Sequence, residues 1–108
     1  MKADLHNHSY YSDGVLSPSE VVKLASEAEC DLFSLTDHDT TNGILEAQVE
    51  ADKLNLNFVN GVEISALWRN MAIHILGLGI DIKNDILQTG LEHNQKLRKE
   101  RAEKIALG

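Results

Sequence analysis

The sequence predicts an α/β fold in which parallel strands alternate with helices. Apolar runs of strand length occupy residues 32–36 and 56–60. Helical patterns over residues 17–28 and 42–54 separate the predicted strands. This β-α-β-α-β order is typical of a parallel sheet with helices packed on it.

The first strand is predicted over residues 2–8, and a polar loop follows it. A helix is expected next, because Ser17 can cap it, Pro18 suits its first position and Glu20 completes a capping box. Its predicted apolar stripe has the spacing i, i+3, i+4, i+7 and consists of Val21, Leu24, Ala25 and Ala28.

The second strand, residues 32–36, leads into a helix over residues 42–54. The apolar face of that helix comprises Ile44, Ala47, Ala51 and Leu54. A third strand over residues 56–60 continues or ends at 61–65, and a fourth over 71–79 follows a turn at 66–70. From Asn84 the pattern is helical to the end, in two pieces around Gly90. Ending in a helix without a closing strand predicts the front part of a larger architecture.

Composition describes a globular protein of one domain, with 108 residues of which 43% are hydrophobic. The net charge of −7 gives no basic surface for nucleic acid, so a phosphate-bearing partner needs a local positive centre such as a metal cluster. No signal peptide or membrane segment is expected, since residues 1–9 are polar and the longest apolar run contains His74. The single cysteine, Cys30, fits a reducing cytoplasm and is best interpreted as a small apolar residue.

Histidines in the first segment suggest a chelate. If residues 2–8 form a strand, then Asp4, His6 and His8 share one face, and the two imidazoles project side by side. Neutral histidines combined with carboxylates suit zinc, manganese or iron. Taken alone, the pair is equally compatible with a polar edge strand whose histidines face water.

Further candidate ligands lie at strand ends, where reactive groups gather in parallel α/β folds. His38 follows the second predicted strand, and Glu63 ends the third. Asp13 lies in the loop after the first strand, and His74 lies within the fourth. Four of the five histidines are therefore at or near this edge of the sheet.

Three motifs carry a resemblance to a known family. They are Asp-Leu-His-Asn-His-Ser at 4–9, Thr-Asp-His-Asp at 36–39 and Gly-Val-Glu-Ile-Ser at 61–65. In this order and spacing they resemble the PHP family, named for its polymerase and histidinol phosphatase members, and residues 73–77 extend the match. The chain is most similar to the branch of nucleoside 3′,5′-bisphosphate phosphatases and 5′-to-3′ exoribonucleases. The resemblance implies a distorted, TIM-like barrel of seven βα units, with residues 1–108 as the N-terminal portion, truncated before the second half.

The resemblance also implies a set of metal ligands. His6 and His8 would bind one ion, Asp13 and His38 a second, Glu63 would bridge two ions, and His74 would hold a third. Manganese is the expected metal, with iron or zinc as substitutes and up to three ions in the intact protein. Asp13 is also compatible with a simple turn residue beside Gly14.

Other polar residues are expected to support this site. Asp37 points away from His38 on the predicted strand, so it is expected to support a ligand or to cap the next segment. Asp4 shares the face of His6 and is expected to orient an imidazole. On the last helix, Arg98 and Arg101 fall among apolar residues, where a charge needs a partner. The resemblance implies that this pair contacts substrate phosphate. The alternatives are that both side chains reach solvent or pair with an internal carboxylate.

The expected activity is hydrolysis of a phosphate monoester or terminal phosphodiester through a metal-activated water. Substrates would be a nucleoside bisphosphate or the 5′ end of a short RNA. The alternatives are another PHP phosphatase, such as a histidinol-phosphatase type, or a catalytically incomplete metal-binding fragment. Tyr10, Tyr11 and Trp68 are candidates for stacking a base, although packing in a loop or core is the simpler interpretation.

Overall fold

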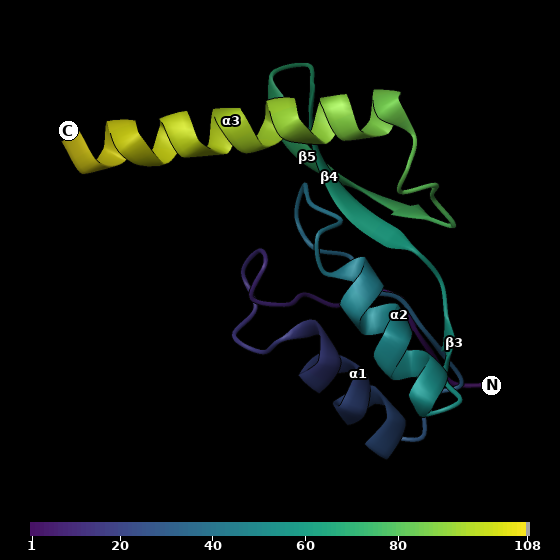
Figure 1. Cartoon of the computed structure of the whole chain (residues 1–108). Coiled ribbons are helices and arrows are strands. Elements are labelled where there is room, and N and C mark those ends of the chain that lie inside the picture. Colours follow the sequence, from purple (N-terminus) through teal and green to yellow (C-terminus); the bar gives the residue numbers. More distant parts are fainter. Residues whose placement is uncertain (108) are drawn as a thin grey trace.

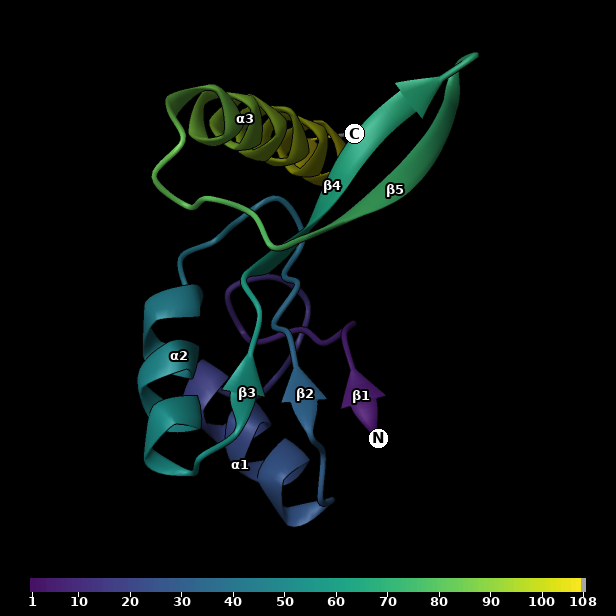
Figure 2. The same ribbon diagram turned by 90° about the vertical axis from the view of Figure 1, so that its right-hand side faces the viewer.

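The computed structural model describes residues 1–107, which form two layers of structure joined by the site region (Figure 1). The N-terminal layer is a small parallel sheet with two helices, and the C-terminal layer is an antiparallel hairpin beside one long helix. Figure 2 shows the helices α1 and α2 on one side of the parallel sheet, with the hairpin and α3 beyond the ends of its strands.

The parallel sheet consists of β1 (Ala3–Asp4), β2 (Leu32–Phe33) and β3 (Asn57–Phe58), in the order β1-β2-β3. The predicted parallel arrangement is confirmed, but the strands are shorter than predicted. Beyond β1, the Asn7 side chain donates to the carbonyls of Asp4 and Ser34 at 3.2 and 3.1 Å. Two backbone bonds still join the segments here, from the Ser34 amide to the Asp4 carbonyl at 3.1 Å and from the Thr36 amide to the Asn7 carbonyl at 2.7 Å. The regular strand nevertheless ends at Asp4, so His6 and His8 follow it instead of lying in it.

Helix α1 (Pro18–Glu27) begins as predicted. The Ser17 hydroxyl accepts from the Glu20 amide at 3.2 Å, and the Glu20 carboxylate accepts from the Ser17 amide at 3.3 Å. The predicted apolar stripe is wrong in part, because Leu24 is 53% exposed while Val22 is fully buried. The buried residues of α1 are Pro18, Val22 and Ala25, which lie on the side of the helix that packs against α2.

Helix α2 (Ile44–Lys53) buries Ile44, Ala47 and Ala51, as predicted. The prediction is wrong for Leu54, which follows the last residue of the helix and is 37% exposed. The alanines of α2 allow close approach to α1 and to the sheet. The resulting core joins both helices to the sheet, and its buried residues are Val22, Ala25, Phe33, Leu35, Ala47, Ala51 and Leu56. This core fixes the strand ends from which the candidate ligands emerge.

Strands β4 (Gly61–Trp68) and β5 (Met71–Leu78) form an antiparallel hairpin, whereas the sequence predicted a strand over 71–79 after a turn at 66–70 without a direction of pairing. The reason is the turn. Only Arg69 and Asn70 separate the strands, both with positive φ, at 51° and 62°. Such a two-residue turn matches the twist of a hairpin and can join only antiparallel strands.

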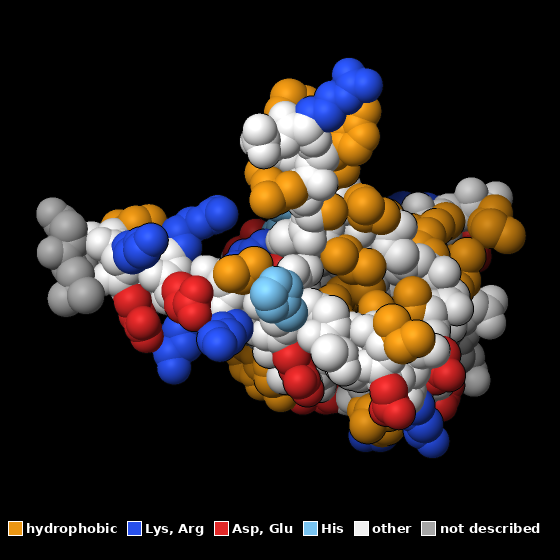
Figure 3. All heavy atoms as spheres, turned by 90° about the horizontal axis from the view of Figure 1, so that it is seen from above, with side chains coloured by type: hydrophobic (Ala, Val, Ile, Leu, Met, Phe, Trp, Pro, Cys, Tyr) orange, Lys and Arg blue, Asp and Glu red, His pale blue; other side chains and the backbone are white. Residues whose placement is uncertain are grey.

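Helix α3 (Asp85–Leu107) is a single helix that passes through Gly90, where two pieces were predicted. Its Leu91 is buried, but Leu97 and Ile105 are exposed. The hairpin also exposes apolar side chains, among them Leu67 and Met71. Figure 3 shows such apolar side chains in orange on the face seen from above. None of the helices within residues 1–107 combines the length and the hydropathy needed to cross a bilayer.

Candidate metal centre

The candidate ligands meet where the parallel strands end and the hairpin begins. The backbone brings two of them together directly, because His38 and Glu63 form an isolated parallel bridge. The Glu63 amide donates to the Asp37 carbonyl at 3.0 Å, and the Asp39 amide donates to the Glu63 carbonyl at 2.9 Å. The segment after β2 is therefore bonded to the start of β4 through the residues immediately before and after His38.

Glu63 lies at the centre of the site and is only 4% exposed. Its Oε1 faces the Nε2 atoms of His6 and His8, the latter at 3.3 Å. Its Oε2 faces the Nδ1 atoms of His38 and His74, at 3.0 and 2.9 Å. Each carboxylate oxygen thus serves a different pair of imidazoles, which is the arrangement needed to bridge two cations.

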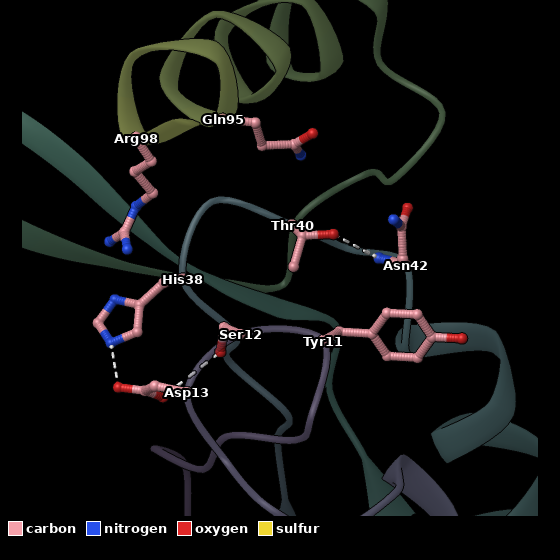
Figure 4. Close-up of a pocket in the computed structure, with 8 residues that line it drawn as sticks. All are labelled: Tyr11, Ser12, Asp13, His38, Thr40, Asn42, Gln95 and Arg98. Atoms are coloured by element: carbon pink, nitrogen blue, oxygen red, sulfur yellow. Dashed lines mark hydrogen bonds and ion pairs between the residues drawn. The ribbon is translucent and has the colours of Figure 1, made fainter. Parts of the chain in front are cut away.

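Asp13 approaches the same imidazoles from the loop after β1. Its Oδ1 lies 2.7 Å from His8 Nδ1, and its Oδ2 lies 3.1 Å from His38 Nε2. Figure 4 shows Asp13 directly beside the His38 ring. Asp13 therefore lies together with the other candidate ligands.

The structure brings all six predicted ligands together, and we call them the histidine–carboxylate cluster. They fall into three overlapping groups whose donor atoms lie within 4.8 Å of one another: His6, His8 and Glu63; His8, Asp13 and His38; and His38, Glu63 and His74. Imidazole nitrogens combined with carboxylate oxygens suit zinc, manganese or iron.

One buried atom supports the fit of this donor set to metal. His38 Nδ1 is inaccessible to solvent and makes no hydrogen bond, although Glu63 Oε2 is 3.0 Å away. The two atoms are close without being aligned for a hydrogen bond. A shared cation would satisfy both, since a buried polar atom without a partner is costly.

Both carboxylates of the cluster favour the anionic state. Burial raises the pKa of the Glu63 carboxyl. The hydrogen bond from His6, the charge of His38 and the hydrogen bond from His8 lower this pKa, and their combined effect is larger than that of burial. Burial also raises the pKa of the Asp13 carboxyl, and the charges of His8 and His38 again outweigh it. The pKa of each group therefore lies below its ordinary value, and both are available to cations at neutral pH.

Asp37 organises the loop that carries Asp13. Its buried carboxylate accepts from the Ser9 amide and hydroxyl, both at 2.6 Å, and from the Ser12 hydroxyl at 2.8 Å. Its effect on the ligands is through this loop. The expectation that Asp4 orients an imidazole is wrong. Its carboxylate accepts from the side-chain amide of Asn7 at 3.0 Å and contacts no imidazole among residues 1–107.

Asp39 links the cluster to helix α3 and was not assigned this role from the sequence. Its fully buried carboxylate accepts from the backbone amide of Ser65 at 2.8 Å and from the Ser65 hydroxyl at 2.6 Å. It also accepts from the side-chain amide of Asn94 at 3.0 Å and from Arg98 Nε at 2.7 Å. Burial raises the pKa of the Asp39 carboxyl, but the bonds from Ser65, Arg98 and Asn94 lower it below its ordinary value. The aspartate following His38 was the only signal in the sequence.

The two arginines of α3 occupy different surroundings. Arg98 pairs with Asp39 and donates to the Ser65 hydroxyl at 3.0 Å. Of the surroundings predicted for this side chain, pairing with an internal carboxylate is therefore the one observed. Arg98 also lines the cavity beside the cluster. Arg101 is exposed one turn further along, with no ion pair or hydrogen bond to residues 1–107.

A cavity of about 360 Å³ opens beside the cluster (Figure 4). The loop after β1, the segment after β2 and helix α3 form its walls. Its lining residues are Tyr11, Ser12, Asp13, His38, Thr40, Asn42, Gln95 and Arg98. Two residues of the cluster, Asp13 and His38, thus face a space large enough for a small ligand.

Comparison with known proteins places this site in a family. Residues 4–104 match the model of the PHP domain. The chain belongs to the PHP family. The resemblance predicted from the three motifs is therefore confirmed, as is the α/β fold of that family.

Curated relatives of this PHP chain include two bacterial proteins. The chain is 44% identical over 102 residues to 3′,5′-nucleoside bisphosphate phosphatase of Chromobacterium violaceum, covering 94% of this chain and 36% of the relative. It is 43% identical over 105 residues to 5′-3′ exoribonuclease Rnm of Escherichia coli, covering 95% and 36%. The chain therefore spans little more than a third of the length of these relatives.

A solved structure agrees closely with this PHP fold. An amidohydrolase from Chromobacterium violaceum, with bound sulfate, has a TM-score of 0.93 and 43% identity. The match covers 96% of this chain and 37% of that chain. Residues 1–107 thus have the arrangement found in part of a larger solved protein.

Proposed function

We propose that the protein acts as a metal-dependent phosphoesterase on nucleotides. Its substrates are nucleoside 3′,5′-bisphosphates, the 5′ ends of short RNAs, or both. The observation that carries this proposal is the convergence of six donor side chains around Glu63, beside a cavity that Arg98 also lines. The names of the two curated relatives support the choice of substrate.

The residues of this chain have distinct tasks in the proposed reaction. Divalent cations bound by the cluster would supply Lewis-acid activation of water and neutralise phosphoryl oxygens. Glu63 connects the pair His6 and His8 to the pair His38 and His74, because each of its carboxylate oxygens faces one pair. This would fix the spacing between the cations that the two pairs bind. Neutral imidazoles fill the remaining positions without adding negative charge, which keeps the site attractive to phosphate in a chain of net charge −7.

Arginine provides the phosphate contact that is independent of the cluster. Asp39 engages Nε of Arg98, which leaves part of the planar guanidinium directed toward the cavity. A guanidinium held in this way binds phosphate oxygens with little further loss of side-chain freedom. We assign Arg98 to this contact, with Arg101 as a second contact to a longer substrate.

The remaining assignments concern the metal and the setting. The three overlapping donor groups support up to three cations, and manganese is our choice, with iron and zinc as substitutes. We also propose that these residues form the N-terminal part of a larger PHP domain, since the match covers 36% of the curated relatives. The single cysteine supports a cytoplasmic location.

The test uses the protein together with any sequence that continues beyond Gly108. Phosphate release is measured from adenosine 3′,5′-bisphosphate, a 5′-phosphorylated short RNA and histidinol phosphate, with manganese, iron or zinc supplied. We expect release from the nucleotide or the RNA in preference to histidinol phosphate. Preference for histidinol phosphate would favour the other phosphatase type.

Matched variants connect this activity to the cluster. Glu63→Gln removes the central charge and is expected to lose bound metal and activity together. Glu92→Gln makes the same change on the exposed surface of α3 and should retain both. A protein that holds metal but releases phosphate from none of these substrates would refute the proposal.

A further inference from the structure

The cavity extends well beyond the cluster, and its far end has different chemistry. In Figure 4, His38, Asp13 and Arg98 lie at one end of the cavity, whereas Tyr11 and Asn42 lie at the other. The first end carries the Arg98 guanidinium, which suits phosphate, and the candidate metal ligands Asp13 and His38. The second end carries an aromatic ring and an amide, without a charged side chain.

Tyr11 is held in place at this second end. A Cβ atom added to Gly43 would lie 3.1 Å from Tyr11 Cδ2, so the ring packs tightly over the backbone just before α2. The Tyr11 amide also donates to the Ser9 hydroxyl at 3.2 Å, and Ser9 is anchored by Asp37. A ring that is 44% exposed and already ordered can stack with little entropic cost.

Polar groups with spare hydrogen-bonding capacity accompany the ring. The backbone amide of Asn42 donates to the Thr40 hydroxyl at 3.1 Å, but the side-chain amide of Asn42 has no hydrogen bond within residues 1–107. Gln95, which also lines the cavity, donates from Nε2 to the Asp39 carbonyl at 2.7 Å and has no hydrogen-bond partner for its Oε1 within residues 1–107. Amide donors and acceptors match the edges of nucleobases, which carry both types of group.

We propose that Tyr11 and Asn42 form a nucleobase subsite, in which the base stacks on Tyr11 and its edge bonds to the Asn42 amide. This inference rests on the proposed function and specifies how its site selects a nucleotide over other phosphate esters. With the phosphate at the His38 and Arg98 end, a single nucleotide spans the cavity. Its volume of about 360 Å³ lies within the range typical of small-molecule sites.

The neighbouring residue Tyr10 provides a matched control. Its ring contacts Tyr11 edge to face, with centroids 5.2 Å apart, and it is 53% exposed, but it does not line the cavity. Removal of either tyrosine deletes the same atoms from the same loop. Only removal of Tyr11 deletes the proposed stacking surface.

The experiment measures equilibrium binding by calorimetry, in the protein with any sequence beyond Gly108 and with its metal content determined. The probes are adenosine 5′-monophosphate and ribose 5-phosphate, which carries a hydroxyl group in place of the base. Because stacking of a base on an aromatic side chain typically changes affinity by about 5- to 150-fold, Tyr11→Ala should raise the Kd of adenosine 5′-monophosphate within that range. The Kd of ribose 5-phosphate should stay within about twofold, and Tyr11→Phe and Tyr10→Ala should bind both probes like the unmodified protein.

Several outcomes would overturn the subsite. They are failure of the unmodified protein to bind the nucleotide more tightly than the sugar phosphate, an equal loss for both probes in Tyr11→Ala, and an equal effect of Tyr10→Ala. These results differ from a failure of the proposed function. Binding that depends on Tyr11 without phosphate release would overturn the function alone, whereas hydrolysis with binding independent of Tyr11 would overturn the subsite alone.

Discussion

Replacement of Asp39 by asparagine should weaken the contact between helix α3 and the rest of the site. The variant keeps the shape of the side chain but replaces a carboxylate oxygen with an NH₂ group. Asp39 accepts four hydrogen bonds, so at least one donor, from Ser65, Asn94 or Arg98, would face another donor. Because Asp39 is fully buried, water cannot replace the lost partner.

The expected loss of stability can be worked from these contacts. A buried hydrogen bond to a charged group is worth about 1.5–3 kcal/mol. The ion pair adds less than about 1 kcal/mol, since the Arg98 side chain is 47% exposed. We therefore expect Asp39→Asn to lower the free energy of unfolding by about 2–4 kcal/mol.

Urea denaturation followed by circular dichroism measures this change. Asp52→Asn is the matched control, because Asp52 is exposed on α2 and should change stability by less than about 0.5 kcal/mol. A loss below about 0.5 kcal/mol in Asp39→Asn would refute the reasoning, since it would mean that the buried carboxylate does not hold the helix.

The same carboxylate predicts a dependence on pH. The pKa of folded Asp39 lies below its ordinary value of 3.8, so its contribution to stability is present above that value. It is lost as the pH falls through the folded pKa. The difference in stability between Asp39→Asn and the unmodified protein should therefore shrink in acid, and a difference that grew as the pH fell would contradict this assignment.

Further predictions concern helix capping, packing and metal affinity. Ser17→Ala should cost about 1 kcal/mol of stability in urea denaturation, because the capping box of α1 is lost. Gly61→Ala should cost about 1–3 kcal/mol in the same assay, since its Cβ would lie 2.7 Å from Thr36 Cγ2. Asp37→Asn should weaken metal binding about 10- to 100-fold in a metal titration, because the loop that carries Asp13 loosens, whereas Asp52→Asn should leave it unchanged. A chelator should lower the Tm of the metal-loaded protein, in proportion to the binding free energy lost.

Local chemistry made several features readable from the sequence. The start of α1 depends only on Ser17, Pro18 and Glu20, whose contacts lie within one turn of helix. The convergence of His6, His8 and His38 was predictable because strand ends of a parallel sheet meet at one edge, whichever length the strands have. Glu63 and His74 instead reach the site from within the antiparallel hairpin. The prediction thus survived even though β1 ends before His6 and His8.

Tertiary structure alone decided the features that depend on distant pairs. Asp39 and Arg98 are 59 positions apart, and no local pattern indicates that one buries its charge against the other. The direction of β5 followed from the positive φ of Arg69 and Asn70, which the sequence pattern does not indicate. The cavity between Tyr11, Asn42 and α3 likewise exists only once three segments are packed together. Periodicity and capping act over a few residues, whereas the pairing of buried charges and the shape of a cavity depend on the packing of the whole chain.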